Sequence, residues 1–366
     1  MSSKQTPMSI ELLVDFKEFW PKLRADLQIA RQSVLIQTFA FEGDSVGQDL
    51  AEELLNSPAE RKQILADSFT RVVLSDRFRF WPANLLDEGL KREARDTALM
   101  ISRLQSAGVT IRYTNPYGVA PRKLLSRNHK KLIVIGEDIA YVGGINFSEH
   151  NADWHDMMFR IEDREAVAFL KEDFHETWKG KDSSQHAKFD GLEILSADGR
   201  NNRSSFQRVV DLIDAAGRSI FVQSPYITFP FYERLRAATR RGVAVTIITP
   251  AQNNWRLFAN YARLESARSE IDLRLFKGGM SHLKAMLIDD EYLIAGSSNF
   301  DYLSYRIHQE LIAVITRQSV IADFRERVVI PDLANSKPAP CDPGAISKHW
   351  LSWKTRLLDA AIEVLT

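Results

Sequence analysis

Apolar residues along the chain gather into short runs of Val, Ile, Leu and Phe, separated by amphipathic stretches with helical spacing. Runs of this length are typical of buried strands. They occupy residues 34–36, 132–135, 220–222 and 243–248. A predicted helix over 231–241 precedes the last run, and Gly242 stands where a helix C-cap is expected. Strands that alternate with helices predict an α/β fold with parallel sheet covered by helices.

The same pattern occurs twice in the 366 residues, a length sufficient for two domains. Two pairs of segments carry the repeat: IELLV at 10–14 with LEILS at 192–196, and ARQSVLIQ at 30–37 with AGRSIFVQ at 216–223. We therefore predict two similar α/β halves, residues 1–190 and 191–366.

The first half contains an insertion over roughly residues 77–105. Residues 85–104 are predicted to form a charged amphipathic helix that ends before Gly108. The segment before this helix, RFRFWP at 77–82, alternates basic and aromatic residues. Such a segment can dock into a lipid headgroup layer, although a strand end that packs its rings inward fits the pattern equally well.

Residues that can act on a phosphate lie in the later part of each half. In the first half, Asn128-His129-Lys130-Lys131 precedes the apolar run at 132–135. One constant offset in residue number relates His129 to His282, Lys131 to Lys284, Gly143 to Gly296 and Asn146 to Asn299. A fixed offset over four functional residue types indicates a duplicated site.

In an extended segment, a His and the Lys two positions later point to the same face. The ammonium group and an asparagine amide beside the imidazole form a pocket for phosphate oxygens. One imidazole can then attack phosphorus while the other protonates the leaving oxygen. Because two lysines balance the charge, we expect no metal and no other cofactor. One active site between the halves is predicted, for which no oligomer is required. His150 has no counterpart at this offset.

Each histidine needs an acceptor that fixes its tautomer. Asp156 follows His129 at nearly the same distance along the chain as Glu310 follows His282. Both acids precede an apolar strand, so we predict that each is the carboxylate partner of the histidine in its own half. The alternative is two surface acids at strand starts.

These residues resemble the phospholipase D superfamily, whose signature is His-x-Lys-x4-Asp followed by Gly-x-x-Asn, present twice. The second copy is complete in His282, Lys284, Asp289, Gly296, Ser298 and Asn299. The first copy has Gly136 where the family has Asp. The resemblance implies that this Asp is a structural buttress, so activity should survive its loss. Glu137 or Asp138 can substitute for it, or Gly136 is a plain turn glycine.

Within the superfamily, segments 143–150 and 296–304 are similar to bacterial cardiolipin synthases of the short type without membrane helices. This resemblance implies a phosphatidyl transferase that works through a phosphohistidine and makes cardiolipin from phosphatidylglycerol. It also implies that His129 is the nucleophile and His282 the general acid. A phospholipase D hydrolase, a nuclease, and an inactive binding protein suggested by Gly136 remain alternatives.

Charge and hydropathy bear on the partners. The 48 basic and 48 acidic residues cancel, which counts mildly against nucleic acid as a partner. The N-terminus has no apolar signal segment, and no run of about 18 apolar residues occurs. With a phospholipid substrate, the protein is therefore predicted to be cytoplasmic and peripheral on the inner membrane. The single cysteine, Cys341, excludes an intramolecular disulfide.

Overall fold

The computed structural model describes residues 8–118, 125–200, 202–267 and 269–340, so Cys341 lies outside the described residues. The chain forms two compact units. The first takes most of the chain up to Ser183, and the second takes the chain from Ser184 onward. Two short segments from the earlier part of the chain also belong to the second unit, and one of them is Trp154–Asp156.

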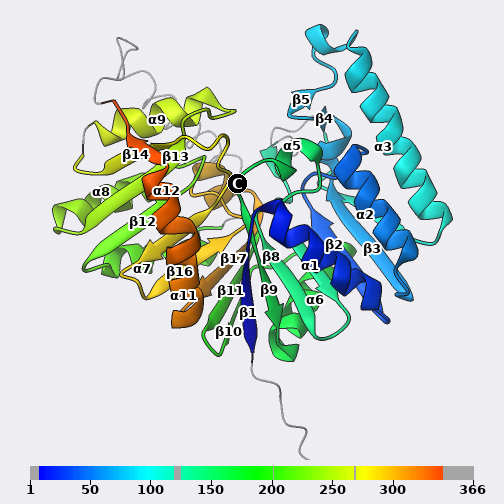
Figure 1. The fold of residues 1–366 in the computed structure, drawn as a ribbon, viewed down its shortest axis with the longest axis horizontal. Helices are drawn as coiled ribbons and strands as arrows, with labels where there is room; N and C mark the ends of the chain where they lie inside the picture. The colour runs from blue at the N-terminus through cyan, green and yellow to red at the C-terminus, as the bar shows by residue number, and fades with distance from the viewer. Residues whose placement is uncertain (1–7, 119–124, 201, 268, 341–366) are drawn as a thin grey trace, which may run out of the picture. The chain divides into compact units, whose positions relative to one another are not determined.

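A seven-stranded sheet forms the centre of the first unit (Figure 1). Its order is β1 (Ser9–Val14), β9 (Met157–Glu162), β8 (Ile139–Gly143), β7 (Leu132–Ile135), β2 (Ser33–Thr38), β3 (Arg61–Asp67) and β6 (Thr110–Thr114). The helices of this unit include α1 (Asp15–Ile29), α2 (Ser45–Asn56), α3 (Glu88–Ser106), α5 (Glu149–Ala152) and α6 (Arg164–Lys179).

A nine-stranded sheet forms the centre of the second unit. Its order is β10 (Gln185–Phe189), β11 (Leu192–Asp198), β17 (Gln309–Ile315), β16 (Tyr292–Gly296), β15 (Ala285–Ile288), β12 (Ser219–Gln223), β13 (Ala244–Pro250), β14 (Asp272–Phe276) and β18 (Ser336–Pro338). The helices include α7 (Arg203–Ala215), α8 (Phe231–Arg240), α9 (Arg256–Ser266), α10 (Tyr302–Arg306), α11 (Gln318–Phe324) and α12 (Ile330–Ala334).

The two sheets repeat one another strand for strand. Seven consecutive strands of the larger sheet, β11 to β14 in spatial order, follow the order of the smaller one. The register is also repeated: Leu132 pairs with Val142 in β7–β8, and Ala285 pairs with Ala295 in β15–β16, at the same offset that relates the motif residues. The prediction of two similar α/β halves is therefore confirmed.

The predicted parallel pairing holds only in part. In the first unit β2, β3 and β6 are parallel, and in the second β12, β13 and β14 are. The remaining pairs within the repeated sheets are antiparallel. The short connections 136–138 and 289–291 permit only antiparallel neighbours, because a parallel crossover needs a dozen or more residues.

Phenylalanines next to the motif asparagines anchor the loops that follow β8 and β16. Phe147 is buried and its ring lies 6.0 Å from that of Phe19 in α1. Phe300, its counterpart in the second half, is buried with its ring 5.6 Å from that of Phe231 in α8. Full burial of such a ring stabilises by about 1.5–3 kcal/mol relative to exposure. Each asparagine is therefore held in place by its neighbour in the chain.

Residues 73–106, which contain the predicted insertion, form a small hairpin and a long helix (Figure 1). Strands β4 (Val73–Leu74) and β5 (Arg77–Phe78) pair antiparallel, and α3 begins after Asp87, whose carboxylate accepts a hydrogen bond from Leu90 N. The predicted helix is confirmed. Phe80 and Trp81 are 57% and 63% exposed, so the interpretation in which these rings pack inward is wrong. No helix among the described residues is long and apolar enough to cross a bilayer.

Candidate functional site

The first half-site lies in the segment that leads into β7. His129 is 7% exposed, and its ring lies 5.0 Å from that of Phe39 in an edge-on contact. The buried Nζ of Lys131 donates to His129 O at 2.9 Å and lies 5.3 Å from the centre of the Phe39 ring. Asp67 accepts a hydrogen bond from Asn128 N at 2.6 Å. Burial raises the pKa of Asp67 to about 6 despite the opposing charge of Arg127.

The second half-site is equally buried. His282 Nδ1 lies 2.7 Å from Asp156 Oδ2, and Lys284 Nζ lies 2.7 Å from the same nitrogen. An ionised carboxylate can only accept a hydrogen bond from Nδ1, whereas an ammonium group can only donate one to it, so the roles at this nitrogen depend on the tautomer of His282. The ammonium group also lies 3.6 Å from Asp156 Oδ2 and donates to His282 O.

Desolvation by burial lowers the pKa of Lys284 to about 8. The negative charges of Asp156 and Glu310 oppose this shift but do not cancel it. Lys284 therefore loses its charge more readily than an ordinary lysine.

The predicted pairing of Asp156 with His129 is corrected by the structure, because Asp156 pairs with His282. Residues 154–156 belong to the second unit, where His282 N donates to His155 O at 2.8 Å and His155 N donates to Met280 O at 3.0 Å. This backbone bridge carries Asp156 to the second histidine, which sequence separation alone does not reveal.

Glu310 is fully buried and accepts hydrogen bonds from Ser297 Oγ at 2.5 Å and Ser304 Oγ at 2.7 Å. The His282 nitrogen with which Glu310 was predicted to pair is occupied by Asp156. His308 Nδ1 lies 3.9 Å from Glu310 Oε1. The predicted carboxylate therefore braces the loop that carries the second motif.

Both motif asparagines present an unsatisfied amide oxygen. Asn146 and Asn299 are 4% and 5% exposed, and neither Oδ1 has a hydrogen-bond partner among the described residues. Leaving a buried polar atom unpaired costs about 1–3 kcal/mol. The same unsatisfied group in both halves indicates a position where a polar ligand binds.

The motif glycines allow two strands to approach closely. A Cβ on Gly143 would lie 2.4 Å from Met157 O, and one on Gly296 would lie 2.2 Å from Leu311 O. No side chain is accommodated at either position. Ser298 Oγ donates to Asn299 O at 2.8 Å, which supports the motif loop.

Asp289 buttresses the second half as its motif position suggests. Its carboxylate accepts hydrogen bonds from the backbone N–H groups of Gly217, Arg218 and Ser219, each at 2.8 Å. Burial alone would raise the pKa of this carboxyl, but these three donors outweigh it and lower the pKa.

Gly136 takes the same backbone conformation as Asp289, with φ of 62° against 54°. Its N–H donates to Ser33 O, as that of Asp289 does to Ser219 O. The neighbouring acids do not replace the missing carboxylate, because Glu137 pairs with Lys171 and Asp138 with Arg164, both in α6. Gly136 is therefore a turn glycine.

Two glutamines were missed as functional residues although both lie in the repeated segment. Gln37 Nε2 donates to Asn128 Oδ1 and Gln223 Nε2 donates to Ser281 Oγ, both at 2.9 Å. Each glutamine thus fixes the residue before a motif histidine. Both Oε1 atoms are buried without a partner among the described residues. Their matched positions at the ends of β2 and β12 are the sequence signal that could have identified them.

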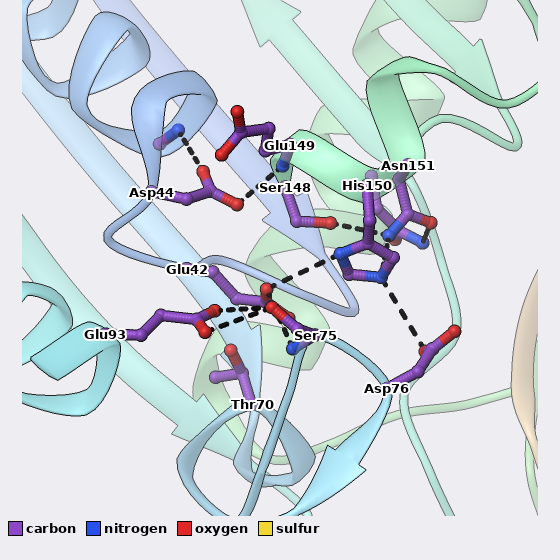
Figure 2. A network of polar contacts seen from close by, with 12 residues as sticks. Glu42, Asp44, Thr70, Ser75, Asp76, Glu93, Ser148, Glu149, His150 and Asn151 are labelled. Carbon is purple, nitrogen blue, oxygen red and sulfur yellow. Dashed lines mark hydrogen bonds and ion pairs between the residues drawn. The ribbon is translucent and has the colours of Figure 1, made fainter. Parts of the chain in front are cut away.

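A polar network surrounds α5, directly after the first motif (Figure 2). Asn151 Oδ1 accepts from Asn146 Nδ2 at 3.3 Å, and Asn151 Nδ2 lies 2.7 Å from His150 Nε2. His150 Nδ1 in turn lies 3.8 Å from Glu42 Oε2 and Nε2 lies 3.7 Å from Asp76 Oδ1. Asn146 of the first motif is therefore connected through Asn151 to His150, which has two carboxylates nearby.

Three carboxylates in this network have a spacing that would suit a metal ion. Oxygen atoms of Glu42, Asp44 and Glu93 lie within 4.8 Å of one another. Burial raises the pKa of Glu42 to about 9, with backbone donation from Ser75 opposing it. The negative charges of Glu93 and Asp44 raise this pKa further.

Comparisons with known proteins agree with this geometry. The family model "Cardiolipin synthase, PLD-like domain" matches residues 23–178 and 209–328. Cardiolipin synthase B of Salmonella typhimurium is 27% identical over 365 residues, covering 88% of this chain and 81% of the relative. The cardiolipin synthase of Listeria monocytogenes is 24% identical over 375 residues, covering 94% and 73%.

Two solved structures share the fold. Phosphatidylserine synthase from Haemophilus influenzae has a TM-score of 0.68 at 14% identity, with 97% of this chain and 94% of that chain covered. Polyphosphate kinase from Porphyromonas gingivalis has a TM-score of 0.61 at 15% identity, with 97% and 53% covered.

Proposed function

The chain belongs to the cardiolipin synthase, PLD-like domain family, and from this premise we propose that it is a phosphatidyl transferase that makes cardiolipin from phosphatidylglycerol. The observation that carries the proposal is the duplicated constellation of a buried His, a buried Lys and an asparagine whose amide oxygen has no partner among the described residues. Such a constellation suits a phosphate in transfer.

The proposed reaction has two steps. His129 attacks the phosphorus of one phosphatidylglycerol, a P–N bond forms, and glycerol leaves with a proton from His282. The terminal hydroxyl of a second phosphatidylglycerol then attacks the phosphohistidine. It gives its proton back to His282, and the P–N bond breaks to release cardiolipin.

The contact between Asp156 and His282 supports the general-acid role. A carboxylate at Nδ1 stabilises the imidazolium form, and the opposite nitrogen then carries the proton that the leaving oxygen needs. The order of the two histidines itself rests on the resemblance to the family. Lys131 and Lys284 supply positive charge for the phosphate oxygens.

Membrane contact is proposed through the aromatic rim, which we define as Phe78, Phe80, Trp81, Leu85 and Leu86. These side chains are between 43% and 84% exposed, and Arg77 and Arg79 alternate with the aromatic residues. Exposed rings beside cations suit an anionic headgroup layer. We propose a peripheral position on the inner membrane.

Conversion of phosphatidylglycerol in mixed micelles tests the function directly. Mass spectrometry should detect cardiolipin and glycerol in equal amounts, and the reaction should continue in excess EDTA because lysines carry the compensating charge. Phosphatidic acid as the sole lipid product would show a hydrolase instead. Loss of activity in EDTA with recovery on adding a divalent ion would contradict the mechanism.

A further inference from the structure

A pocket of about 730 Å³ lies within the first unit, between the 3-10 turn η1 (Ser68–Arg71), the β4–β5 hairpin, α3 and β6. Its apolar lining includes Leu74, Ile101 and Tyr113. Among the described residues that line it, Arg71 and Arg79 are the only charged ones, and none carries a carboxylate. A pocket with two cations and an apolar wall suits an anionic amphiphile.

The side chain of Arg79 is bound to the backbone of Arg71. Arg79 Nη1 donates to Arg71 O at 2.9 Å. The Arg71 guanidinium lies 5.2 Å from the centre of the Tyr113 ring, and that of Arg79 lies 5.6 Å from the centre of the Phe80 ring. Ring contacts of this kind use the face of the guanidinium, so the N–H groups at its edge remain for a phosphate.

The pocket adjoins the first half-site. Ser68 and Thr70 line it, and Phe69 between them stacks on Phe39 at 4.8 Å. Phe39 in turn contacts the His129 ring. The residue between Ser68 and Thr70 is thus connected to His129 through the ring of Phe39.

The pocket also reaches the aromatic rim, because Phe80 belongs to both. Free anions in solution have no need of the apolar wall or of the rim.

We propose that this pocket binds the acceptor phospholipid, with its phosphate on Arg71 and Arg79 and part of an acyl chain against Leu74 and Ile101. The inference rests on the proposed function. Cardiolipin contains two phosphates, of which one is transferred through His129. The phosphate of the acceptor takes no part in bond exchange, so it requires a second cationic site near the nucleophile.

Two reactions of the same enzyme distinguish an effect on the acceptor from an effect on the donor. Cardiolipin formation uses a second phospholipid, whereas exchange of labelled glycerol into phosphatidylglycerol transfers the same phosphatidyl group to an uncharged small alcohol. In the double variant Arg71→Gln, Arg79→Gln, the ratio of cardiolipin formation to glycerol exchange should fall roughly ten- to a hundredfold. Arg71→Lys with Arg79→Lys should recover part of it.

Arg95→Gln, an exposed change in α3 outside the pocket lining, is the matched control and should keep the wild-type ratio. An unchanged ratio in the double Gln variant, or an equal fall of both reactions with an unaltered melting temperature, would overturn the proposal. Absence of both reactions from the wild type would instead overturn the proposed function.

A labelling experiment does not depend on the folding of the arginine variants. Phosphatidylglycerol with a photoactivatable acyl chain should crosslink to α3 or η1 in His129→Ala protein. Unlabelled phosphatidylglycerol should prevent the crosslink, and inorganic phosphate at the same concentration should not. Crosslinks confined to other segments, or equal protection by phosphate, would rule out a lipid site.

Discussion

His282 places its Nδ1 atom 2.7 Å from Oδ2 of Asp156, a residue that follows the first copy of the motif in the chain. The same nitrogen lies 2.7 Å from Lys284 Nζ, so one ring nitrogen contacts both a carboxylate and a lysine. Because residues 154–156 pair with 280–282 through the backbone, the second half-site is completed by a segment from the first half of the sequence.

Asp156→Asn should slow turnover roughly 10²- to 10⁴-fold, because the amide keeps the size of the side chain but not the charge that stabilises an imidazolium. Steady-state rates with phosphatidylglycerol measure this loss. Asp153→Asn, an exposed change just before this segment, serves as the control. A loss of less than about tenfold, below the usual contribution of an acid–base group, would remove Asp156 from the acid–base machinery.

The two histidines should respond differently to the leaving group. His282→Ala withholds a proton from the leaving oxygen, so a nitrophenyl phosphodiester, which needs that proton far less, should recover much of the rate. This variant should also accumulate phosphohistidine on His129. His129→Ala should be inactive on both substrates. Peptide mapping of the trapped phosphate decides the order, and phosphate found on His282 would reverse it.

Much of this arrangement follows from the sequence, since the constant offset between the two motif copies predicts the matched hairpins and places His129 and His282 before equivalent strands. The sequence does not predict that Asp156 belongs to the second half-site. A distance along the chain does not show which backbone segment residues 154–156 pair with. Gln37 and Gln223 were visible in the repeat. Their role depends on hydrogen bonds across neighbouring strands, which a linear pattern does not specify.

Asp289→Asn should lower the free energy of unfolding by about 1–3 kcal/mol, because three backbone N–H groups lose a charged acceptor. Asparagine tolerates the positive φ, so the change isolates the charge. The folded-state pKa of Asp289 is lowered, so its contribution is present above the ordinary carboxyl pKa and is lost as pH falls through the folded value.

Denaturant unfolding at neutral and acidic pH measures this difference, which should shrink below about pH 4. Gly136→Asp is the complementary change, because no atom lies within 4 Å of a Cβ there and the backbone matches that of Asp289. It should leave activity intact. A large loss of activity in Gly136→Asp would show that the glycine itself is required.

Lys284 should produce an alkaline limb in the pH dependence of kcat/KM. Burial lowers the pKa of its ammonium to about 8, so the positive charge that the phosphate meets is lost as pH rises through this value. Since kcat/KM reports the free enzyme, the limb should lie near this pKa. In Lys284→Arg, whose charge persists, whatever activity remains should lack this limb. An unmoved limb would assign it to another group.

Vesicle binding should depend on the aromatic rim. Trp81 and Leu86 are 63% and 84% exposed, and removal of either apolar surface should cost roughly 1 kcal/mol of membrane binding, or about fivefold in partitioning. Trp81→Ala with Leu86→Ala should therefore weaken sedimentation with phosphatidylglycerol vesicles about 25-fold if the two effects add. Trp255→Ala is the matched control, because this tryptophan is 57% exposed in the second unit. If the aromatic rim makes the membrane contact, the control should bind normally and cardiolipin synthesis on vesicles should fall only in the double variant. A larger effect at Trp255 would move the membrane contact to the second unit, and equal binding by all three proteins would leave the rim without this role.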